Sequence, residues 1–233
     1  EMLWCKPGTF TMGSPKSEVG RDDDKTLHAV TLTHGFWLGK HEVTQAQWEE
    51  VMGTNPSKFK GTNLPVETVS WTEAVSFCKK LTEREKKAGR LPAGLAYALP
   101  TEAQWEYACR AGTRTAYSFG NAITEKQANF KGTNDNIKKT TPVGSYGPNA
   151  WGFHDMHGNV WEWCSDWYGG YPKGAMTDPT GPAVGSLRVI RGGSWFIDAR
   201  YLRSAFRSWC GPVFRFNFLG FRPSLRLVQG RAE

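Results

Sequence analysis

Residues 188–195 read RVIRGGSW and residues 219–223 read LGFRP, and the interval between these two segments has an unusual composition. One residue in three from Trp195 to Phe221 is aromatic, against 13% of the whole chain. Arginines at positions 200, 203, 207 and 215 are interspersed among the aromatic residues, with the period of neither a helix nor a strand. Aromatic residues combined with arginine are typical of recognition surfaces. The interval therefore predicts a binding face.

The length of 233 residues allows a substantial core, and neither a repeat of fixed period nor a linker divides the chain. No run approaches the roughly 18 apolar residues that a membrane span requires. The net charge of +7 is modest and comes with neither a lysine-rich patch nor a nucleic-acid-binding motif. Nucleic acid is therefore not the expected partner, and the arginines are expected to brace loops through carbonyl and carboxylate groups.

The five cysteines, at positions 5, 78, 109, 164 and 210, are far apart and include no Cys-x-x-Cys pair. This spacing argues against a zinc site and against a dense disulfide framework, but it does not exclude a single disulfide. Cys78 and Cys109 lie within helical patterns, where a buried and inert thiol is expected.

Three helices are predicted by capping boxes, which begin at Thr44, Ser70 and Thr101. The second helix is expected to bury one face and the third to end at Gly112; the residues expected on the buried face are Trp71, Ala74, Val75, Cys78 and Leu81. Trp48 and Trp105 are expected to anchor the core.

Strands are expected at both sides of the first polar loop. Residues 7–14 predict a strand, and residues 29–32 and 36–38 predict a hairpin around Thr33-His34-Gly35. The run of charges at 21–25 predicts a solvated tip, and the Gly-, Asn- and Pro-rich chain after residue 112 predicts short strands with long loops.

Seven motifs occur in order along nearly the whole chain: GTFTMGS (8–14), EVT (42–44), PV before VSW (65–71), LPTEAQWEYA (99–108), GNVWEW (158–163), RGGSW (191–195) and GFR (220–222). Together they resemble the formylglycine-generating-enzyme, or sulfatase-modifying factor, family. The resemblance implies an α+β chain of one C-type-lectin-like domain over residues 1–233, with few helices, short strands and long loops.

The catalytic residues of the family are not matched. The formylglycine-generating oxidases place two copper-binding cysteines shortly after the Arg-Gly-Gly-Ser-aromatic motif, where this chain has Ile197 and Leu202. The related sulfoxide synthases bind iron through a His-x-x-x-His-x-Glu helix, whereas His154 and His157 lie three apart in a loop-like segment. We therefore expect no redox chemistry and no catalytic cofactor, and we expect these histidines to form loop hydrogen bonds.

A narrower branch of the same fold, the variable proteins of diversity-generating retroelements of the treponemal type, resembles this chain more fully. These proteins carry a Gly-Gly-Ser-Trp … Leu-Gly-Phe-Arg segment here, in which template Asn codons change to any codon ending in a pyrimidine. That rule excludes Trp, so Trp195 and Trp209 are expected to be scaffold. The resemblance makes residues 188–223 the variable binding region, with these ligand-binding positions: Phe196, Ile197, Asp198, Tyr201, Phe206, Ser208, Cys210, Gly211, Val213, Phe214, Phe216, Asn217 and Phe218.

Physical chemistry supports this reading, because phenylalanines in such a segment can form a contiguous apolar patch that a soluble monomer would otherwise avoid. The alternative is that several of them are buried. The arginines are expected to hold the loop backbone while other side chains change; these are Arg200, Arg203, Arg207, Arg215 and Arg222.

The resemblance also implies structural calcium, whose ligands are oxygen atoms. One family site maps onto the side chains of Asp155 and Glu162 with the carbonyls of Gly158 and Val160. Salt bridges to arginine are the alternative for these carboxylates. A second family site maps less directly onto Asn129, Phe130, Asp135 and Ile137.

These observations predict a non-catalytic, monomeric, ligand-binding protein displayed at the cell surface or outer membrane. Its partner is expected to be a protein or glycan on another cell. Glu-Met-Leu-Trp before Cys5 lacks the small residues of a lipidation site, so we expect any anchor to lie outside this sequence. Two alternatives stay open: a formylglycine-generating-type oxidase acting on a peptide cysteine, and a calcium-dependent carbohydrate lectin.

Overall fold

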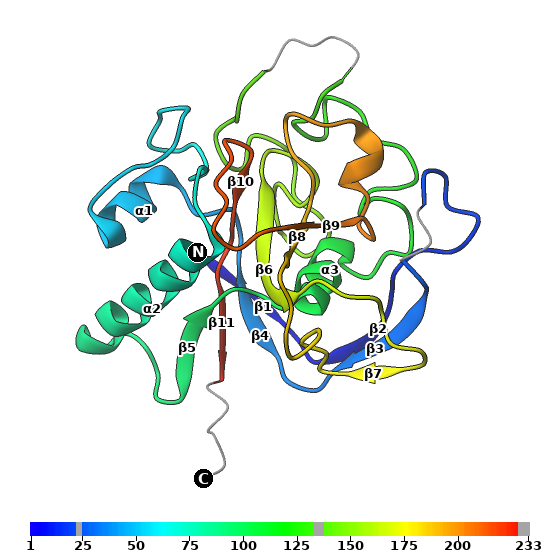
Figure 1. The fold of residues 1–233 in the computed structure, drawn as a ribbon, viewed down its shortest axis with the longest axis horizontal. Helices are drawn as coiled ribbons and strands as arrows, with labels where there is room; N and C mark the ends of the chain where they lie inside the picture. Colours follow the sequence, from blue (N-terminus) through cyan, green and yellow to red (C-terminus); the bar gives the residue numbers. More distant parts are fainter. Residues whose placement is uncertain (22–24, 133–137, 228–233) are drawn as a thin grey trace.

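The computed structural model describes residues 1–21, 25–132 and 138–227. The expected solvated tip at 21–25 is wrong at Lys25, which is buried with its ammonium group 4.6 Å from the Phe206 ring centroid, and residues 22–24 lie outside the described range. The three described α-helices each begin at an expected capping box (Figure 1). In each case the hydroxyl of the N-cap residue accepts a hydrogen bond from the third helical residue, whose side chain accepts one in return. The helices are α1 (Gln45–Met52), α2 (Trp71–Lys87) and α3 (Glu102–Arg110).

One sheet contains strands from the two ends of the described chain. In it, β1 (Met2–Cys5) pairs with β4 (Phe36–Gly39), which pairs with β11 (Ser224–Leu227), which pairs with β5 (Leu95–Ala98), all antiparallel. The C-terminal end of the binding region is therefore fixed to the first strands of the chain. Helix α2 runs beside β5 (Figure 1).

A second sheet carries the expected binding region. Its order is β10 (Leu219–Gly220), β6 (Trp161–Trp167), β8 (Arg188–Arg191) and β9 (Arg207–Cys210). The RVIRGGSW and LGFRP segments thus contribute strands, as a framework should. The interval between them loops across the upper half of Figure 1 and includes the short 3-10 helix η1 (Ala199–Leu202).

The third sheet corrects one prediction, because residues 29–32 and 36–38 do not form a hairpin. Strand β3 (His28–Leu32) pairs instead with β2 (Gly8–Met12) and with β7 (Met176–Thr177), while β4 belongs to the first sheet. The tight Thr33-His34-Gly35 connection passes the chain from one sheet to the next. A local turn signal could not distinguish this crossing from a hairpin.

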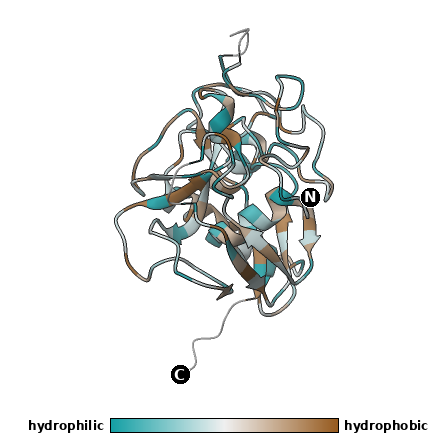
Figure 2. Cartoon of the chain, turned by 90° about the vertical axis from the view of Figure 1, so that its right-hand side faces the viewer, coloured by the Kyte–Doolittle hydropathy of each residue, from teal (hydrophilic) through white to brown (hydrophobic). Residues whose placement is uncertain are grey.

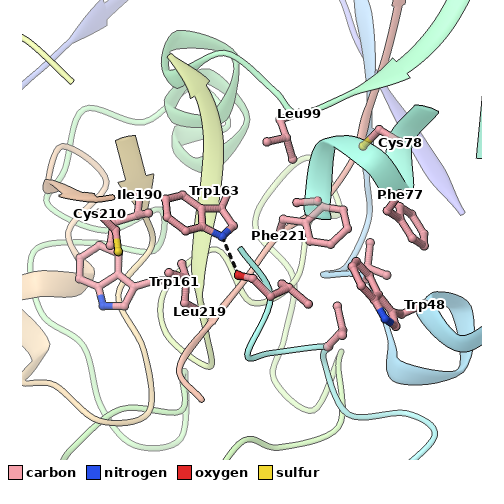
Figure 3. Packing of buried hydrophobic residues seen from close by; sticks show 14 of the residues in the cluster. Trp48, Phe77, Cys78, Leu99, Trp161, Trp163, Ile190, Cys210, Leu219 and Phe221 are labelled. Atoms are coloured by element: carbon pink, nitrogen blue, oxygen red, sulfur yellow. Dashed lines mark hydrogen bonds between the residues drawn. The ribbon is translucent and has the colours of Figure 1, made fainter. Parts of the chain in front are cut away.

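The largest core lies between α1, α2 and the second sheet, where Trp48, Phe77, Trp163 and Phe221 pack together (Figure 3). The indole of Trp163 donates a hydrogen bond to the Val69 carbonyl at 3.0 Å, so its one polar atom is satisfied. Trp48 and Trp105 are buried as predicted. Hydrophobic segments, brown in Figure 2, run through the strands in the middle of the molecule.

The buried face of α2 differs slightly from the prediction. Phe77 is buried and Val75 is exposed, while Ala74 and Cys78 lie in the core as expected. Helix α3 ends at Arg110, and Ala111 and Gly112 both adopt positive φ, which agrees with the expected stop at the glycine. All five cysteines are free and buried. Within the described residues, no helix has the length and apolar character needed to cross a bilayer.

Candidate functional site

Four phenylalanines of the expected binding region form one surface cluster, which we call the phenylalanine face: Phe196, Phe214, Phe216 and Phe218. The first three side chains are 55%, 56% and 40% exposed, and Phe218 is half-buried. The rings of Phe196 and Phe216 both stack nearly parallel to that of Phe218, with centroids 5.8 and 5.0 Å away. The ring of Phe214 follows at 6.2 Å from Phe216. Contiguous apolar clusters are uncommon on the surfaces of soluble monomers, so this one makes the region a candidate interaction site.

The backbone beneath this face is held by the segment that connects α1 to α2. The amide of Thr68 donates to the Phe216 carbonyl at 2.9 Å, and the amide of Trp71 donates to the Pro212 carbonyl at 3.1 Å. The indole of Trp195 donates to the Asn217 carbonyl and packs on Phe59, 5.5 Å away. Trp195 thus supports the loop, as the sequence predicted, whereas the contribution of Phe59 was not foreseen.

Three positions expected on the exposed face are buried instead: Phe206, Cys210 and Gly211. The Phe206 ring lies in the main core, 5.0 Å from the ring of Tyr201 and 6.0 Å from that of Trp161. Cys210 lies in the same core because β9 directs alternate side chains to opposite faces. The expectation that Phe206 is exposed is therefore wrong.

The same alternation exposes a residue that the codon rule had assigned to the scaffold. Trp209 points away from the core and is 52% exposed, with its ring 6.5 Å from that of Tyr168. The strand period of β9 is the signal that could have found it. The remaining expected positions are at the surface to different degrees, with Asp198 and Val213 exposed and the others half-buried: Ile197, Tyr201, Ser208 and Asn217.

Buried arginines hold the framework of this region in place. Arg203 donates to the carboxylate of Glu18 and to the carbonyl of Gly20, and its Nε donates to the Arg200 carbonyl at 2.8 Å. Arg200 does not hold the loop backbone as expected, because its side chain is exposed and donates to the hydroxyl of neighbouring Tyr201. Arg215 is also exposed, and it forms a two-hydrogen-bond ion pair with Glu73.

An ionic network joins α3 to two strands of the binding region, β8 and β9. Arg207 donates to both oxygens of Glu102, at 2.8 and 2.6 Å. Arg191 pairs with Glu106 and also donates to the Phe206 carbonyl. Because all these groups are buried, the network fixes the backbone of β8 and β9.

In the first expected calcium site, the carboxylate of Glu162 is paired with an arginine. Both oxygens of the fully buried Glu162 accept hydrogen bonds from Arg222, each at 2.7 Å, and Oε2 also accepts one from the Trp105 indole. Asp155 accepts a hydrogen bond from the Gly144 amide at 2.7 Å. In the part of the chain that the structure describes, no group of three or more His, Cys, Asp or Glu side chains could hold a metal ion. The salt-bridge alternative describes Glu162, whose two oxygens are both paired with Arg222, and the calcium assignment at Asp155, Gly158 and Val160 stays a prediction.

The second expected calcium site retains one feature that a cation would satisfy. The side-chain oxygen of Asn129 is buried without a hydrogen-bond partner, while its amide nitrogen donates to the Lys139 carbonyl at 3.0 Å. An unpaired buried oxygen is the donor type that calcium takes. Asp135 and Ile137 lie outside the described residues.

The cysteine and histidine environments disfavour thiol and metal chemistry. Burial raises the pKa of Cys5, Cys78 and Cys109 to about 12, so these thiols carry almost no thiolate at neutral pH. His157 is buried between the Leu202 carbonyl, at 2.7 Å, and the Ser118 hydroxyl, at 3.0 Å. The Nδ1 atom of His154 lies 2.8 Å from the Tyr146 carbonyl. Both histidines thus form loop hydrogen bonds, as predicted.

Known proteins match this chain over most of its length. The family model described as the sulfatase-modifying factor enzyme 1-like domain matches residues 1–226. The formylglycine-generating enzyme of Mus musculus is 34% identical over 84% of this chain, and the chain spans only 52% of that enzyme. Treponema denticola variable protein 1 superposes with a TM-score of 0.84 at 32% identity, covering 97% of this chain and 94% of that one.

A second solved structure, PvdO from Pseudomonas aeruginosa, superposes with a TM-score of 0.83 at 30% identity, covering 97% of this chain and 94% of that one. These matches confirm the expected α+β fold of few helices and several small sheets. With nearly every residue inside the matched range, the chain belongs to the family of sulfatase-modifying factor enzyme 1-like domains.

Proposed function

We propose that this chain is a non-catalytic ligand-binding protein whose phenylalanine face, together with Asp198, Trp209 and Val213, contacts a macromolecular partner. The observation that carries the proposal is the cluster of exposed phenylalanine rings on loops whose backbone is tied to α2 and to the core. A soluble protein loses free energy by exposing such a cluster, so its presence favours a binding role. A protein or glycan on another cell is the partner that we propose.

We further propose that the face is diversified among copies of the protein, as in the variable proteins of retroelements. The similarity to Treponema denticola variable protein 1 supports this, as does the separation between exposed side chains and buried struts. The exposed positions make few hydrogen bonds through their side chains, so their replacement would leave the framework intact. Display at a cell surface, through a segment outside this sequence, is part of the proposal.

The relatives that are formylglycine-generating enzymes favour oxidation of a peptide cysteine as the alternative. Against it, the positions of the two copper-binding cysteines hold Ile197 and the fully buried Leu202. Cys210 is the cysteine nearest in sequence to these two positions, but it is buried, and burial raises the pKa of its thiol. Incubation of the Cu(I)-treated protein with a cysteine-containing peptide, followed by mass spectrometry of the peptide, should show no conversion.

We also propose a stabilising calcium ion at Asn129, where the unpaired side-chain oxygen supports one ligand. Such an ion would hold the loop between α3 and β6 and would take no part in chemistry. This role differs from that of a calcium-dependent lectin, in which the ion itself binds sugar.

The binding role can be tested by selection from two displayed libraries of this protein. One library randomises the face, and the matched control randomises five apolar residues exposed elsewhere: Trp4, Val19, Leu27, Phe119 and Val184. Both are selected against biotinylated hen lysozyme as a model protein partner. The face library should yield specific binders and the control library should not. Equal enrichment from both libraries, or from neither, would contradict the proposal.

A further inference from the structure

Two arginines differ from the buried struts described above because they lack a carboxylate partner. Arg191, Arg203, Arg207 and Arg222 each form an ion pair with a glutamate. Arg226 is half-buried, yet its guanidinium makes neither a hydrogen bond nor an ion pair with any residue that the structure describes. Cations removed from water are normally paired, so this arrangement requires another explanation.

The second such residue, Arg188, is held rigidly between two indole rings. Its guanidinium carbon lies 3.7 Å from the ring centroid of Trp71 and 3.3 Å from that of Trp167. Nη1 donates to the Ser165 carbonyl at 2.6 Å, while the buried Nε has no partner. The stacking orients a cation at a fixed place without neutralising it.

Arg188 and Arg226 line the same groove, which has a volume of about 590 Å³ and lies between α2, β5, β11 and the end of β6. We call it the cationic groove. Its hollow arises because Ala96 and Ala98, on the same face of the sheet as Arg226, have small side chains. Trp71 and Tyr97, both half-buried, add apolar surface. This size and mixed lining are typical of small-ligand sites.

The side chains that line the cationic groove carry an excess of positive charge. Lys79 and Lys86 of α2 join the two arginines, whereas Glu83 is the one acid among the described residues that line it. Burial lowers the pKa of both Arg188 and Arg226, and the nearby Asp166 offsets this effect only in part. An anion placed between these groups would supply the missing counter-charge.

We propose that the cationic groove binds a small amphiphilic anion, in which an oxyanion group pairs with Arg226 and Arg188 and an apolar body packs on Trp71, Ala96 and Ala98. Sulfonate, phosphate and carboxylate share the required chemistry, because each presents several oxygens to a guanidinium group. This site is separate from the phenylalanine face, and its occupancy does not depend on the function proposed for that face.

The proposal can be tested by isothermal titration calorimetry with 1-naphthalenesulfonate, with 1-naphthol as the uncharged analogue. Arg226→Gln should weaken sulfonate binding by about ten-fold or more, as expected for the loss of a charge-assisted hydrogen bond. Arg226→Lys keeps the charge and should retain part of the affinity. Naphthol should bind far more weakly than the sulfonate.

Two controls separate this site from general effects. Lys80→Gln removes one positive charge from the same helix outside the groove and should leave the affinity within about two-fold of wild type. Triple replacement of Phe196, Phe214 and Phe216 by serine should also leave it unchanged, which excludes binding at the phenylalanine face. Circular dichroism checks that each variant is folded. Undetectable sulfonate binding by the wild type, or unchanged binding by folded Arg226→Gln, would overturn the proposal.

Discussion

Arg222 and Glu162 form a fully buried ion pair in which Nε and Nη2 of the arginine each donate to one carboxylate oxygen at 2.7 Å. The pair joins the Gly-Phe-Arg motif at the end of the binding region to the Gly-Asn-Val-Trp-Glu-Trp motif of β6. Arg222 also donates to the carbonyls of Gly39 and His154, at 3.0 and 2.9 Å. One side chain thus ties β4, β6 and the loop before β6 to the C-terminal strands.

Breaking this pair should destabilise the whole domain. Arg222→Met leaves the Glu162 carboxylate buried without its counter-ion, so the free energy of unfolding should fall by about 3–5 kcal/mol. Urea denaturation followed by tryptophan fluorescence measures the change. The exposed pair Lys40–Glu1 provides the control, and Lys40→Ala should cost less than about 1 kcal/mol. Equal losses for the two variants would show that the buried pair has no special role.

His157 should make stability depend on pH in a defined window. Burial lowers the pKa of His157 to about 4 in the folded protein, so unfolding allows the ring to take up a proton below its ordinary pKa of 6.5. The contribution of neutral His157 to the free energy of unfolding is therefore complete above about pH 6.5. It is lost as the pH falls toward 4, and the loss amounts to at most about 3 kcal/mol.

Denaturation of the wild type and of His157→Gln at several pH values isolates this contribution. The difference in free energy of unfolding between the two proteins should shrink as the pH falls from 7 to 4. A difference that stays constant over this range would mean that His157 titrates normally in the folded state.

The cysteines should react only after unfolding. Burial raises the pKa of Cys5, Cys78 and Cys109 to about 12, and all five thiols are buried. At pH 8 the native protein should therefore react with 5,5′-dithiobis(2-nitrobenzoate) many times more slowly than protein in guanidinium chloride. Rapid modification of two cysteines in the native state would instead favour the oxidase alternative.

Calcium should stabilise the protein through Asn129. Differential scanning fluorimetry should show a higher midpoint of unfolding in calcium chloride than in EGTA, since a ligand at about 100 times its Kd adds about 2.7 kcal/mol. Asn129→Leu removes the unpaired oxygen and should abolish the difference. Magnesium at equal concentration tests selectivity. Identical midpoints of the wild type in calcium and in EGTA would refute the site.

Local signals in the sequence predicted local structure well. The three capping boxes predicted the starts of the three α-helices found in the described part of the chain, because the hydrogen bonds that define a capping box lie within four residues. The prediction of a hairpin at residues 29–38 was wrong because the pairing of a strand depends on segments that are distant in sequence. Strands β3 and β4 lie next to each other in sequence but find partners in different sheets.

The sequence predicted which segment forms the candidate site, but it did not predict which side chains of that segment are exposed. The sequence located the phenylalanine face, but it could not show that Phe206 enters the core or that Trp209 leaves it, because both depend on the register of β9. Glu162 is a similar case. A carboxylate in a metal-binding motif looks the same in sequence whether an ion or Arg222 neutralises it, and only the three-dimensional contact distinguishes the two.

The central claim is that the phenylalanine face is a recognition surface separable from the fold, and thermal unfolding of a triple serine variant at Phe196, Phe214 and Phe216 tests it most directly. Exposed replacements cost little, so the midpoint should stay within about 5 °C of the wild type. Phe206→Ser, in the core, should lower the midpoint by about 10 °C or more. Unfolding of the triple variant at a temperature as low as that of Phe206→Ser would contradict the account.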